Sequence, residues 1–470
     1  MVPLRILITA VLAVAGMAPT AVPAASQTAC LPLGVDGRCP AWVSTEDGGD
    51  FDITTAVTTA PDGTAVYAAG TTVTPGGYRS LLVASDAAGG ERRWAVTDGR
   101  DGDAYDTAYA LAVSPDGGSV YIAGGACGAI DDGSTCDVLV AAHDAETGAT
   151  RWTALRDGTG RGLDSAQGLA LSRDGSVLFV GGQTFSAQTG LDYLLLAYDA
   201  RSGDELWHAT WDRARGGDRA SALALAGDAV VLTGRSGSDA EADIATVAFD
   251  TREEREGEIL WAARYDGGGN LDEAFAMAAD ARRVVVAGES RTTTPFSPVV
   301  VAYDAVTGER SWVDRHDDPG LLGGTAFDVT ISRDGRLVAA TGYTRRGDAK
   351  GPTTTLYDAS TGEPRWRAHL PDGVGQGVAI SPDGRRVYTT GPTYTRRGTM
   401  HRTVSYLAAT GAERWSGLYE QAAPPHGLLD TLLYPSGIAL SPDGTHVYVG
   451  GATRGPLATH DDAMVLSYQA

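Results

Sequence analysis

Eight tryptophans recur about 50 residues apart along the chain, and this repeat constrains the fold more than any other feature. They are Trp42, Trp94, Trp152, Trp207, Trp261, Trp312, Trp366 and Trp415. A similar segment precedes most of these tryptophans, and residues 197–207 are an example: Ala-Tyr-Asp-Ala-Arg-Ser-Gly-Asp-Glu-Leu-Trp. A period of this length is typical of architectures that repeat one supersecondary unit, so a single repeat domain can hold most of the 470 residues.

Each repeat contains short segments rich in Val, Ala and Tyr and bounded by Gly, Asp and Pro, which is the pattern of β-strands. An Asp-Gly turn such as Pro61-Asp-Gly63 joins two of these segments in most repeats. Pro presets φ, Asp bonds its own backbone and Gly accepts a positive φ, so the tripeptide predicts a hairpin. No segment shows a sustained helical period. We therefore expect an all-β chain that folds as a single eight-bladed β-propeller with four-stranded antiparallel blades.

The two ends of the chain carry complementary parts of one repeat. The last repeat stops at residues 467–470, before its Gly and Trp, and the missing parts occur in residues 37–42. We therefore expect the N-terminal strand to complete the last blade. On this prediction the propeller spans residues 37–470.

The N-terminus has the pattern of a secretory signal peptide. Arg5 is followed by an apolar run, residues 6–18, and then by small-residue cleavage sites. We expect a signal peptide at residues 1–25 and an N-terminal lead at residues 26–36. The apolar run is too short to span a bilayer comfortably, and no other stretch approaches that length. The prediction is a secreted protein without a transmembrane segment.

The spacing of the four cysteines is typical of disulfide bonds in an exported protein. Cys30 and Cys39 are as far apart as Cys127 and Cys136, and both intervening loops are short and hydrophilic. Of the three possible pairings, we therefore favour Cys30–Cys39 and Cys127–Cys136. We do not expect a lipid anchor at Cys30, because the residues before it lack the apolar side chain of a lipobox.

The net charge of −22 and pI near 4.7 argue against nucleic acid as a partner, because such a surface repels polyphosphate. The charge is explained more simply by solubility than by a dedicated basic partner. We expect a monomer that binds an unidentified small molecule, glycan or protein.

The spacing of Ala, Gly and Trp resembles the tryptophan-docking motif of pyrroloquinoline-quinone-like repeat propellers, the family of the eight-bladed quinoprotein dehydrogenases. The motif is complete at Ala84/Gly90/Trp94, Ala142/Gly148/Trp152, Ala197/Gly203/Trp207 and Ala302/Gly308/Trp312. The resemblance implies that each indole stacks between neighbouring blades. Leu356 and Ser405 replace the Ala in two repeats, and extra residues around 253–256 interrupt a third.

The chain departs from the dehydrogenases of that family at their cofactor site. Those enzymes carry adjacent cysteines, a calcium ion and a catalytic Asp, whereas this chain has no adjacent cysteines and only one asparagine, Asn270. Gly-x-Ser-x-Gly, His-Glu-x-x-His and Walker patterns are also absent from the sequence. We expect a secreted, non-catalytic binding or scaffold module with its ligand at the channel mouth, and no firm cofactor. The alternatives are a quinoprotein-like oxidoreductase using pyrroloquinoline quinone and calcium, and a propeller hydrolase of lactonase or glycosidase type.

Two sets of residues are candidates for that channel-mouth face. The first is an aspartate that recurs before the inner strand of five consecutive repeats, Asp52, Asp106, Asp164, Asp218 and Asp272. These carboxylates are weak candidates for calcium ligands, and the preferred interpretation is that each accepts backbone N–H bonds in a tight loop.

The second set consists of arginines in the loops between the second and third strands of neighbouring repeats: Arg291, Arg345, Arg346, Arg396, Arg397 and Arg454. Arginines along one arc can hold a carboxylate or phosphate through paired hydrogen bonds. The alternative is that these loops are simply Arg-rich and solvated. No catalytic residue is predicted.

Overall fold

The computed structural model describes residues 30–33, 36–48, 51–99, 104–128, 135–160, 162–213, 216–238, 241–269, 271–291, 296–318, 320–396, 398–420, 437–454 and 461–470. The predicted signal peptide, residues 1–25, lies outside these ranges. Every regular element within them is a β-strand, so the all-β class is confirmed for this part of the chain. No helix in these ranges is long and apolar enough to cross a membrane.

The strands form antiparallel units that follow one another along the chain. Each unit contains four strands, which pair in sequence order in every unit but the last. Units 1 and 2 are β3 (Asp52–Thr59), β4 (Ala65–Thr74), β5 (Gly77–Asp86) and β6 (Arg92–Asp98), then β7 (Ala104–Val113), β8 (Ser119–Cys127), β9 (Cys136–Asp144) and β10 (Thr150–Arg156). Units 3 and 4 are β11 (Ser165–Leu171), β12 (Val177–Ser186), β13 (Gly190–Asp199) and β14 (Glu205–Trp211), then β15 (Arg219–Ala226), β16 (Ala229–Ser238), β17 (Glu241–Asp250) and β18 (Ile259–Tyr265).

The second half of the chain continues the same pattern. Units 5 and 6 are β19 (Leu271–Ala279), β20 (Arg283–Arg291), β21 (Ser297–Asp304) and β22 (Arg310–Arg315), then β23 (Leu321–Ile331), β24 (Leu337–Arg346), β25 (Ala349–Asp358) and β26 (Pro364–His369). Unit 7 is β27 (Gly377–Ile380), β28 (Arg386–Thr395), β29 (Gly398–Leu407) and β30 (Glu413–Glu420). Unit 8 joins β31 (Ile438–Leu440), β32 (His446–Arg454) and β33 (Asp461–Gln469) to β2 (Trp42–Glu46).

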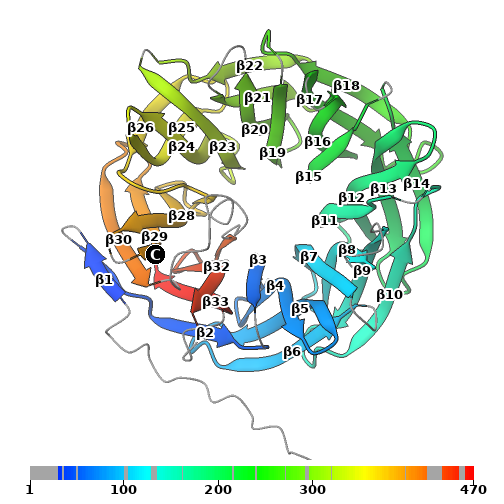
Figure 1. Cartoon of the computed structure of the whole chain (residues 1–470), viewed down its shortest axis with the longest axis horizontal. Helices are drawn as coiled ribbons and strands as arrows, with labels where there is room; N and C mark the ends of the chain where they lie inside the picture. Colours follow the sequence, from blue (N-terminus) through cyan, green and yellow to red (C-terminus); the bar gives the residue numbers. More distant parts are fainter. Residues whose placement is uncertain are drawn as a thin grey trace, which may run out of the picture.

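The units stand around a common centre, with the first strand of each nearest to it and the last on the outside (Figure 1). Short parallel contacts, such as Ala242 with Leu271 between β17 and β19, link neighbouring units. A radial arrangement of four-stranded antiparallel sheets is that of a β-propeller.

The N-terminal strand completes the last unit, as predicted. β2 pairs antiparallel with β33 from Trp42↔Ser467 to Glu46↔Ala463. The sequence did not predict β1 (Cys30–Leu33), which lies in the expected lead and pairs antiparallel with β30 as a fifth strand of unit 7. β30 is the outermost strand of its unit, so its free edge offers unpaired backbone groups to a further strand.

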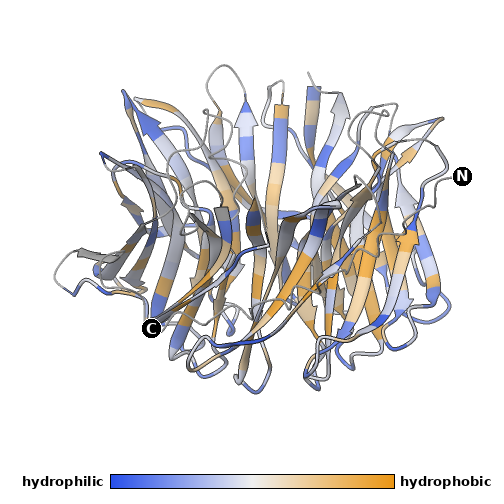
Figure 2. Ribbon diagram, turned by 60° about the horizontal axis from the view of Figure 1, so that its bottom comes forward, coloured by the Kyte–Doolittle hydropathy of each residue, from blue (hydrophilic) through white to orange (hydrophobic). Residues whose placement is uncertain are grey.

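The apolar core lies between successive units. One cluster, for example, joins Tyr121 and Val138 of unit 2 to Leu178 and Leu196 of unit 3. Hydrophobic residues follow the strands, whereas the loops at the lower end of the ring in Figure 2 are largely hydrophilic. A unit that buries apolar side chains on both faces needs a neighbour on each side, which is why the repeat assembles into a ring.

The tryptophans dock between units, as the motif predicts. Six indole Nε1–H groups donate to a backbone carbonyl of the next unit at 2.9–3.1 Å, in the pairs Trp42–Ala87, Trp94–Ala145, Trp152–Ala200, Trp261–Ala305, Trp312–Ala359 and Trp366–Ala408. The motif glycine packs on the indole face so closely that a Cβ on Gly203 would lie 2.5 Å from Cδ2 of Trp152. These tryptophans hold the ring together.

Two tryptophans dock differently, for local reasons. Extra residues before Gly257 loosen the contact with Trp207, so that a Cβ on Gly257 would lie 3.4 Å from Cε3 of the indole. Trp415 faces the junction of the chain ends, where the guanidinium of Arg38 lies 5.5 Å from the indole centroid. Arg38 also donates to the backbone oxygen of Gln469 at 2.6 Å, and so ties the N-terminal segment to the C-terminal strand.

Candidate functional site

The structure places the described members of the predicted arginine arc in different surroundings. Arg345 and Arg346 close β24 and are exposed, but Arg346 Nη2 is 2.9 Å from Asp318 Oδ2. Arg291 ends β20 and lies over the ring of Phe296, 4.6 Å from its centroid. Arg396, after β28, is exposed. Arg397 lies outside the described residues, as does the side chain of Arg454, whose backbone ends β32.

Beside Arg345 the structure places an aromatic and acidic group of side chains that the sequence did not reveal. We call it the Tyr343 cluster: Glu289, Thr325, Phe327, Tyr343 and Lys350. Lys350 Nζ lies 4.1 Å from the centroid of Tyr343, whose ring stacks on Phe327 at a centroid distance of 5.9 Å. Burial, and then the charge of Arg345, lowers the pKa of Lys350. A cation held on an aromatic face next to an exposed guanidinium makes a positive, partly apolar surface.

Glu289 is the acidic member of the Tyr343 cluster. Its Oε2 accepts a hydrogen bond from Thr325 Oγ1 at 2.5 Å. Burial raises the pKa of Glu289 to about 7; the Thr325 hydrogen bond opposes this shift, and the nearby charge of Glu273 adds to it. The carboxyl group therefore gains or loses its proton close to neutral pH.

We expect Glu289 to make folding pH-dependent. Its pKa rises from 4.5 in the unfolded chain to about 7 in the fold, so the folded state binds more protons between these values. This contribution is fully present below pH 4.5 and is lost as the pH rises through 7, with an upper limit of about 3 kcal/mol.

Urea unfolding at a series of pH values, compared between the wild-type protein and Glu289→Gln, measures this contribution. The amide oxygen can still accept the Thr325 hydrogen bond but does not titrate. As the pH rises toward 7, the variant should lose less stability than the wild-type protein. Identical pH profiles would show that Glu289 does not titrate in this window.

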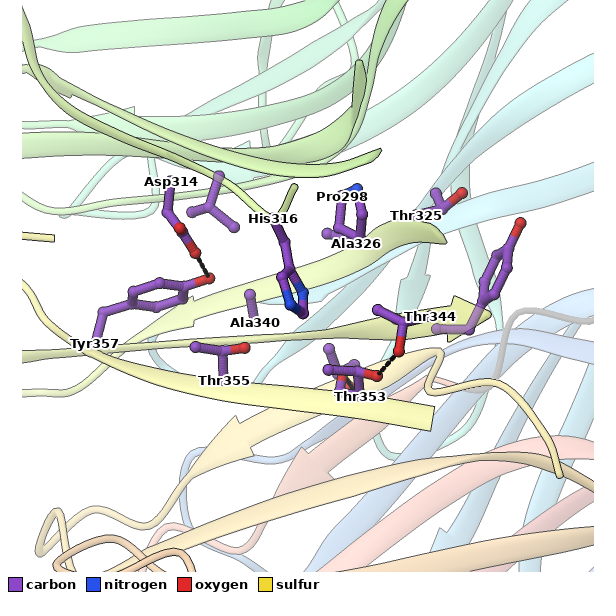
Figure 3. A pocket seen from close by; sticks show the side chains of 14 residues that line it. Pro298, Asp314, His316, Thr325, Ala326, Ala340, Thr344, Thr353, Thr355 and Tyr357 are labelled. Carbon is purple, nitrogen blue, oxygen red and sulfur yellow. Dashed lines mark hydrogen bonds between the residues drawn. The ribbon is translucent and has the colours of Figure 1, made fainter. Parts of the chain in front are cut away.

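A small cavity next to the Tyr343 cluster does not suit an organic ligand. It lies between units 5 and 6, lined by His316, Tyr343 and Tyr357 among others (Figure 3). Tyr357 donates its hydroxyl hydrogen to Asp314 Oδ2 at 2.8 Å. The cavity measures about 20 Å³, which is room for roughly one water molecule. A ligand at the Tyr343 cluster therefore has to bind at the surface.

The five recurring aspartates do not assemble into one ring-shaped site. All five are fully buried, and no described acidic cluster contains two of them. Four of them accept backbone N–H bonds, as the preferred interpretation expects: Gly48 to Asp52 at 2.6 Å, Phe185 to Asp164 at 2.8 Å, Arg213 to Asp218 at 3.3 Å and Gly267 to Asp272 at 2.7 Å. Asp106 faces Arg79, with 3.7 Å between Nη1 and Oδ2.

One predicted disulfide is confirmed. Cys127 and Cys136 are bonded, and they pair directly across β8 and β9. Cys39 is also disulfide-bonded, but the side chain of Cys30 lies outside the described residues, so the Cys30–Cys39 pairing stays a prediction. A disulfide is compatible with a location outside the cytoplasm.

The Tyr343 cluster was missed because its members come from four strands of two units, β20, β23, β24 and β25. One signal in the sequence could have located it. The position after the repeated Gly of the second strand changes chemistry between units, with Gln183, Arg235, Glu289 and Tyr343 as examples. Where a repeat becomes irregular at a structurally equivalent position, its residues are free to serve function.

Comparison with solved structures finds likeness at low identity. Hydrazine synthase of Kuenenia stuttgartiensis is 14% identical, with 90% of this chain and 97% of that chain covered and a TM-score of 0.48. A structure of U3-55K is 13% identical, with 80% and 98% covered and a TM-score of 0.48. No curated protein matches the chain.

A family model matches residues 43–289 and 297–459, which make up most of the chain. They include the units that carry the docked tryptophans and the Tyr343 cluster. The family is described as "Outer membrane protein assembly factor BamB", and its repeat is the PQQ-like β-propeller repeat inferred from the motif. The chain belongs to this family of BamB-like β-propellers.

Proposed function

We propose that the protein is a secreted, closed eight-bladed β-propeller that acts as a non-catalytic binding or scaffold module and docks an acidic segment of a partner protein. The docking surface is the positive face that Arg345 and Lys350 form at Tyr343. We extend it to Arg396, which is exposed two residues after Tyr394, a residue whose charge acts on Tyr343. The observation that carries the proposal is the placement of Lys350 on the ring of Tyr343 beside the exposed Arg345.

The local charge supports an acidic partner. The chain as a whole carries a net charge of −22, so a positive patch on it stands out and is expected to select its partner and steer its approach. Tyr343 and Phe327 add apolar area of the kind that protein interfaces favour.

The small size of the cavity beside the Tyr343 cluster favours surface docking over turnover at this place. The adjoining cavity holds about one water molecule, whereas enzyme sites for organic substrates need several hundred Å³. Family membership, the Cys127–Cys136 bond and the signal-like N-terminus support a location outside the cytoplasm. Docking of an acidic segment does not require pyrroloquinoline quinone.

The test is binding of an oligo-glutamate peptide, measured by fluorescence anisotropy at low and at physiological salt. We expect salt-dependent binding that the double variant Arg345→Glu/Arg396→Glu weakens by about tenfold or more. The matched control is Arg333→Glu/Arg336→Glu, which changes the net charge equally on the exposed hairpin turn of unit 6. Equal loss of binding in both variants, or no binding by the wild-type protein, would remove the proposed surface.

A second measurement separates the catalytic alternatives. The protein mixed with pyrroloquinoline quinone and Ca²⁺ should not reduce a redox dye with alcohols or aldose sugars, and it should not cleave lactones or glycosides. Saturable turnover in either assay would replace the binding module by an enzyme.

A further inference from the structure

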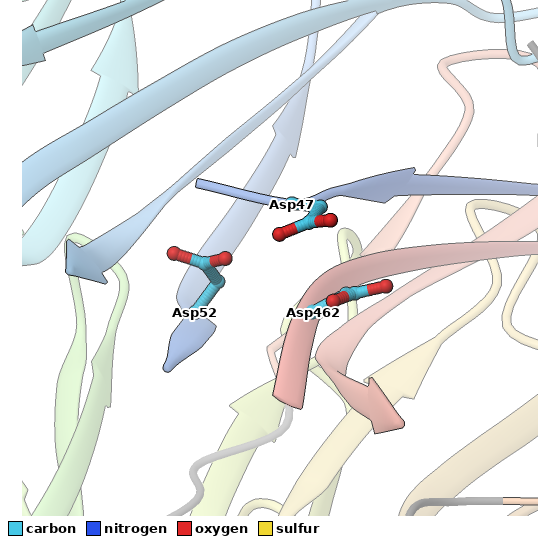
Figure 4. Close-up of side chains that lie close together, drawn as sticks. All are labelled: Asp47, Asp52 and Asp462. Atoms are coloured by element: carbon cyan, nitrogen blue, oxygen red, sulfur yellow. The ribbon is translucent and has the colours of Figure 1, made fainter. Parts of the chain in front are cut away.

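Three clusters of aspartates lie at boundaries between successive units of the described chain: Asp462, Asp47 and Asp52; Asp192, Asp212 and Asp218; and Asp243, Asp266 and Asp272. In each cluster, one carboxylate oxygen per residue lies within 4.8 Å of the others. The three carboxyl groups of the first cluster gather from separate segments (Figure 4).

The clusters share one construction. The first member lies on the third strand of a unit, the second follows the outer strand of that unit, and the third lies at the start of the next inner strand. A group bound by all three would therefore connect two units and the loop between them. In the first cluster it would join β33 to the segment between β2 and β3, where the two ends of the chain meet.

Buried carboxylate oxygens without a hydrogen-bond donor belong to these clusters. Asp192 is 7% exposed and Asp272 fully buried, and Oδ1 of each has no hydrogen-bond partner. Oδ2 of each residue is occupied, by the hydroxyl of Thr189 and by the N–H of Gly267, both at 2.7 Å. A buried carboxylate oxygen without a donor is costly, and a bound cation removes that cost.

The equivalent boundary between units 1 and 2 shows what happens when the aspartates are missing. Arg79 occupies the position of Asp192, and Gly99 that of Asp212, while Asp106 keeps the third position. The guanidinium of Arg79 lies 3.7 Å from Asp106 Oδ2. A protein cation therefore stands where two of the three carboxylates are lost. Arg264 likewise pairs with Asp243 in the third cluster. The oxygens of Asp192 and Asp272 that lack a donor are the ones that a cation from outside the chain would serve.

We propose that each complete cluster binds a divalent cation, and that this cation is Ca²⁺. The donors are all carboxylate oxygens, which hard cations prefer, and water can complete the flexible coordination shell that Ca²⁺ accepts. Mg²⁺ demands stricter octahedral geometry and gives up its water reluctantly. Each bound ion links two neighbouring units, and one of them links the segments near the two ends of the chain.

The test uses the full mature protein and compares thermal unfolding in EDTA and in a Ca²⁺ titration. We expect a saturable rise in the unfolding temperature with Ca²⁺. Tb³⁺ should bind at the same sites with luminescence excited through tryptophan, because Trp211 directly precedes Asp212. An unfolding temperature that neither Ca²⁺ nor EDTA changes would overturn the proposal.

Variants of the exposed members of the clusters test the sites themselves. The triple variant Asp47→Asn/Asp212→Asn/Asp266→Asn should lose the Ca²⁺-dependent shift and weaken Ca²⁺ binding by about tenfold or more. In EDTA it should be at least as stable as the wild-type protein, because one negative charge leaves each cluster.

The matched control is Asp62→Asn/Asp174→Asn/Asp334→Asn, which makes the same charge change on exposed hairpin turns. It should keep the full Ca²⁺ response. Loss of the response in both triple variants, or its retention in both, would show that the clusters are not the sites.

Discussion

Deletion of residues 26–46 is expected to unfold the protein or to lower its unfolding temperature by more than about 10 °C. The deletion removes β2, which pairs with β33 from Trp42 to Glu46. Trp42 is 4% exposed, and its indole donates to the carbonyl of Ala87 in unit 1. Removing a buried tryptophan alone costs about 3–5 kcal/mol, and the deletion also exposes the edge of β33 to solvent and to other chains.

The matched control is deletion of residues 26–33, which removes only the fifth strand of unit 7. The shorter deletion should carry Cys39→Ser, because it removes Cys30, the predicted disulfide partner of Cys39, whereas the longer deletion removes both cysteines. Circular dichroism melting and limited proteolysis should show a far smaller loss for the shorter deletion. Equal melting temperatures would mean that β2 does not hold the ring closed.

Adding the missing strand back as a peptide tests the role of β2 directly. A synthetic peptide covering residues 37–46 should restore part of the lost stability of the longer deletion variant, because an added strand can pair with the free edge of β33. A peptide with Trp42→Ala should restore much less. If the two peptides act alike, pairing and not indole docking accounts for closure.

The repeat made the fold predictable because each part of it has a local physical cause. Gly63 shows this at the hairpin turns: its φ is 73°, and the Oδ1 of Asp62 accepts the N–H of Thr64 at 2.9 Å. Turn chemistry and strand pattern act within a few residues, so one sequence suffices to recognise them. The pairing of β2 with β33 was predictable for a different reason, namely that an incomplete repeat at one end needs the missing part from the other.

The candidate site could be predicted only in part, because its contacts join residues far apart in the chain. Loop arginines are visible in the sequence, but nothing in it shows that Arg346 is paired with Asp318 while Lys350 lies on Tyr343. The contacts of the aspartates could not be predicted for the same reason. Asp218 was singled out as one of five aspartates at equivalent positions of the repeat, whereas its carboxylate neighbours in the fold are Asp192 and Asp212.

Gly203→Ala is expected to destabilise the protein by about 2–5 kcal/mol. Two penalties add at this position. Gly203 has a φ of 78°, which costs an L-residue about 1–2 kcal/mol. The new Cβ would also lie 2.5 Å from the indole of Trp152, so the ring has to move away from the carbonyl of Ala200, to which it donates at 3.1 Å.

Gly227→Ala separates the two penalties. Gly227 has a φ of 68° in a hairpin turn, but a Cβ there would meet nothing within 4 Å. This variant should lose only about 1 kcal/mol or slightly more. Urea unfolding followed by tryptophan fluorescence measures both variants, and the difference between them is the contribution of indole docking at one boundary between units. Equal losses would mean that the motif glycine serves only the turn, and that the close packing of Gly203 on Trp152 does not stabilise the ring.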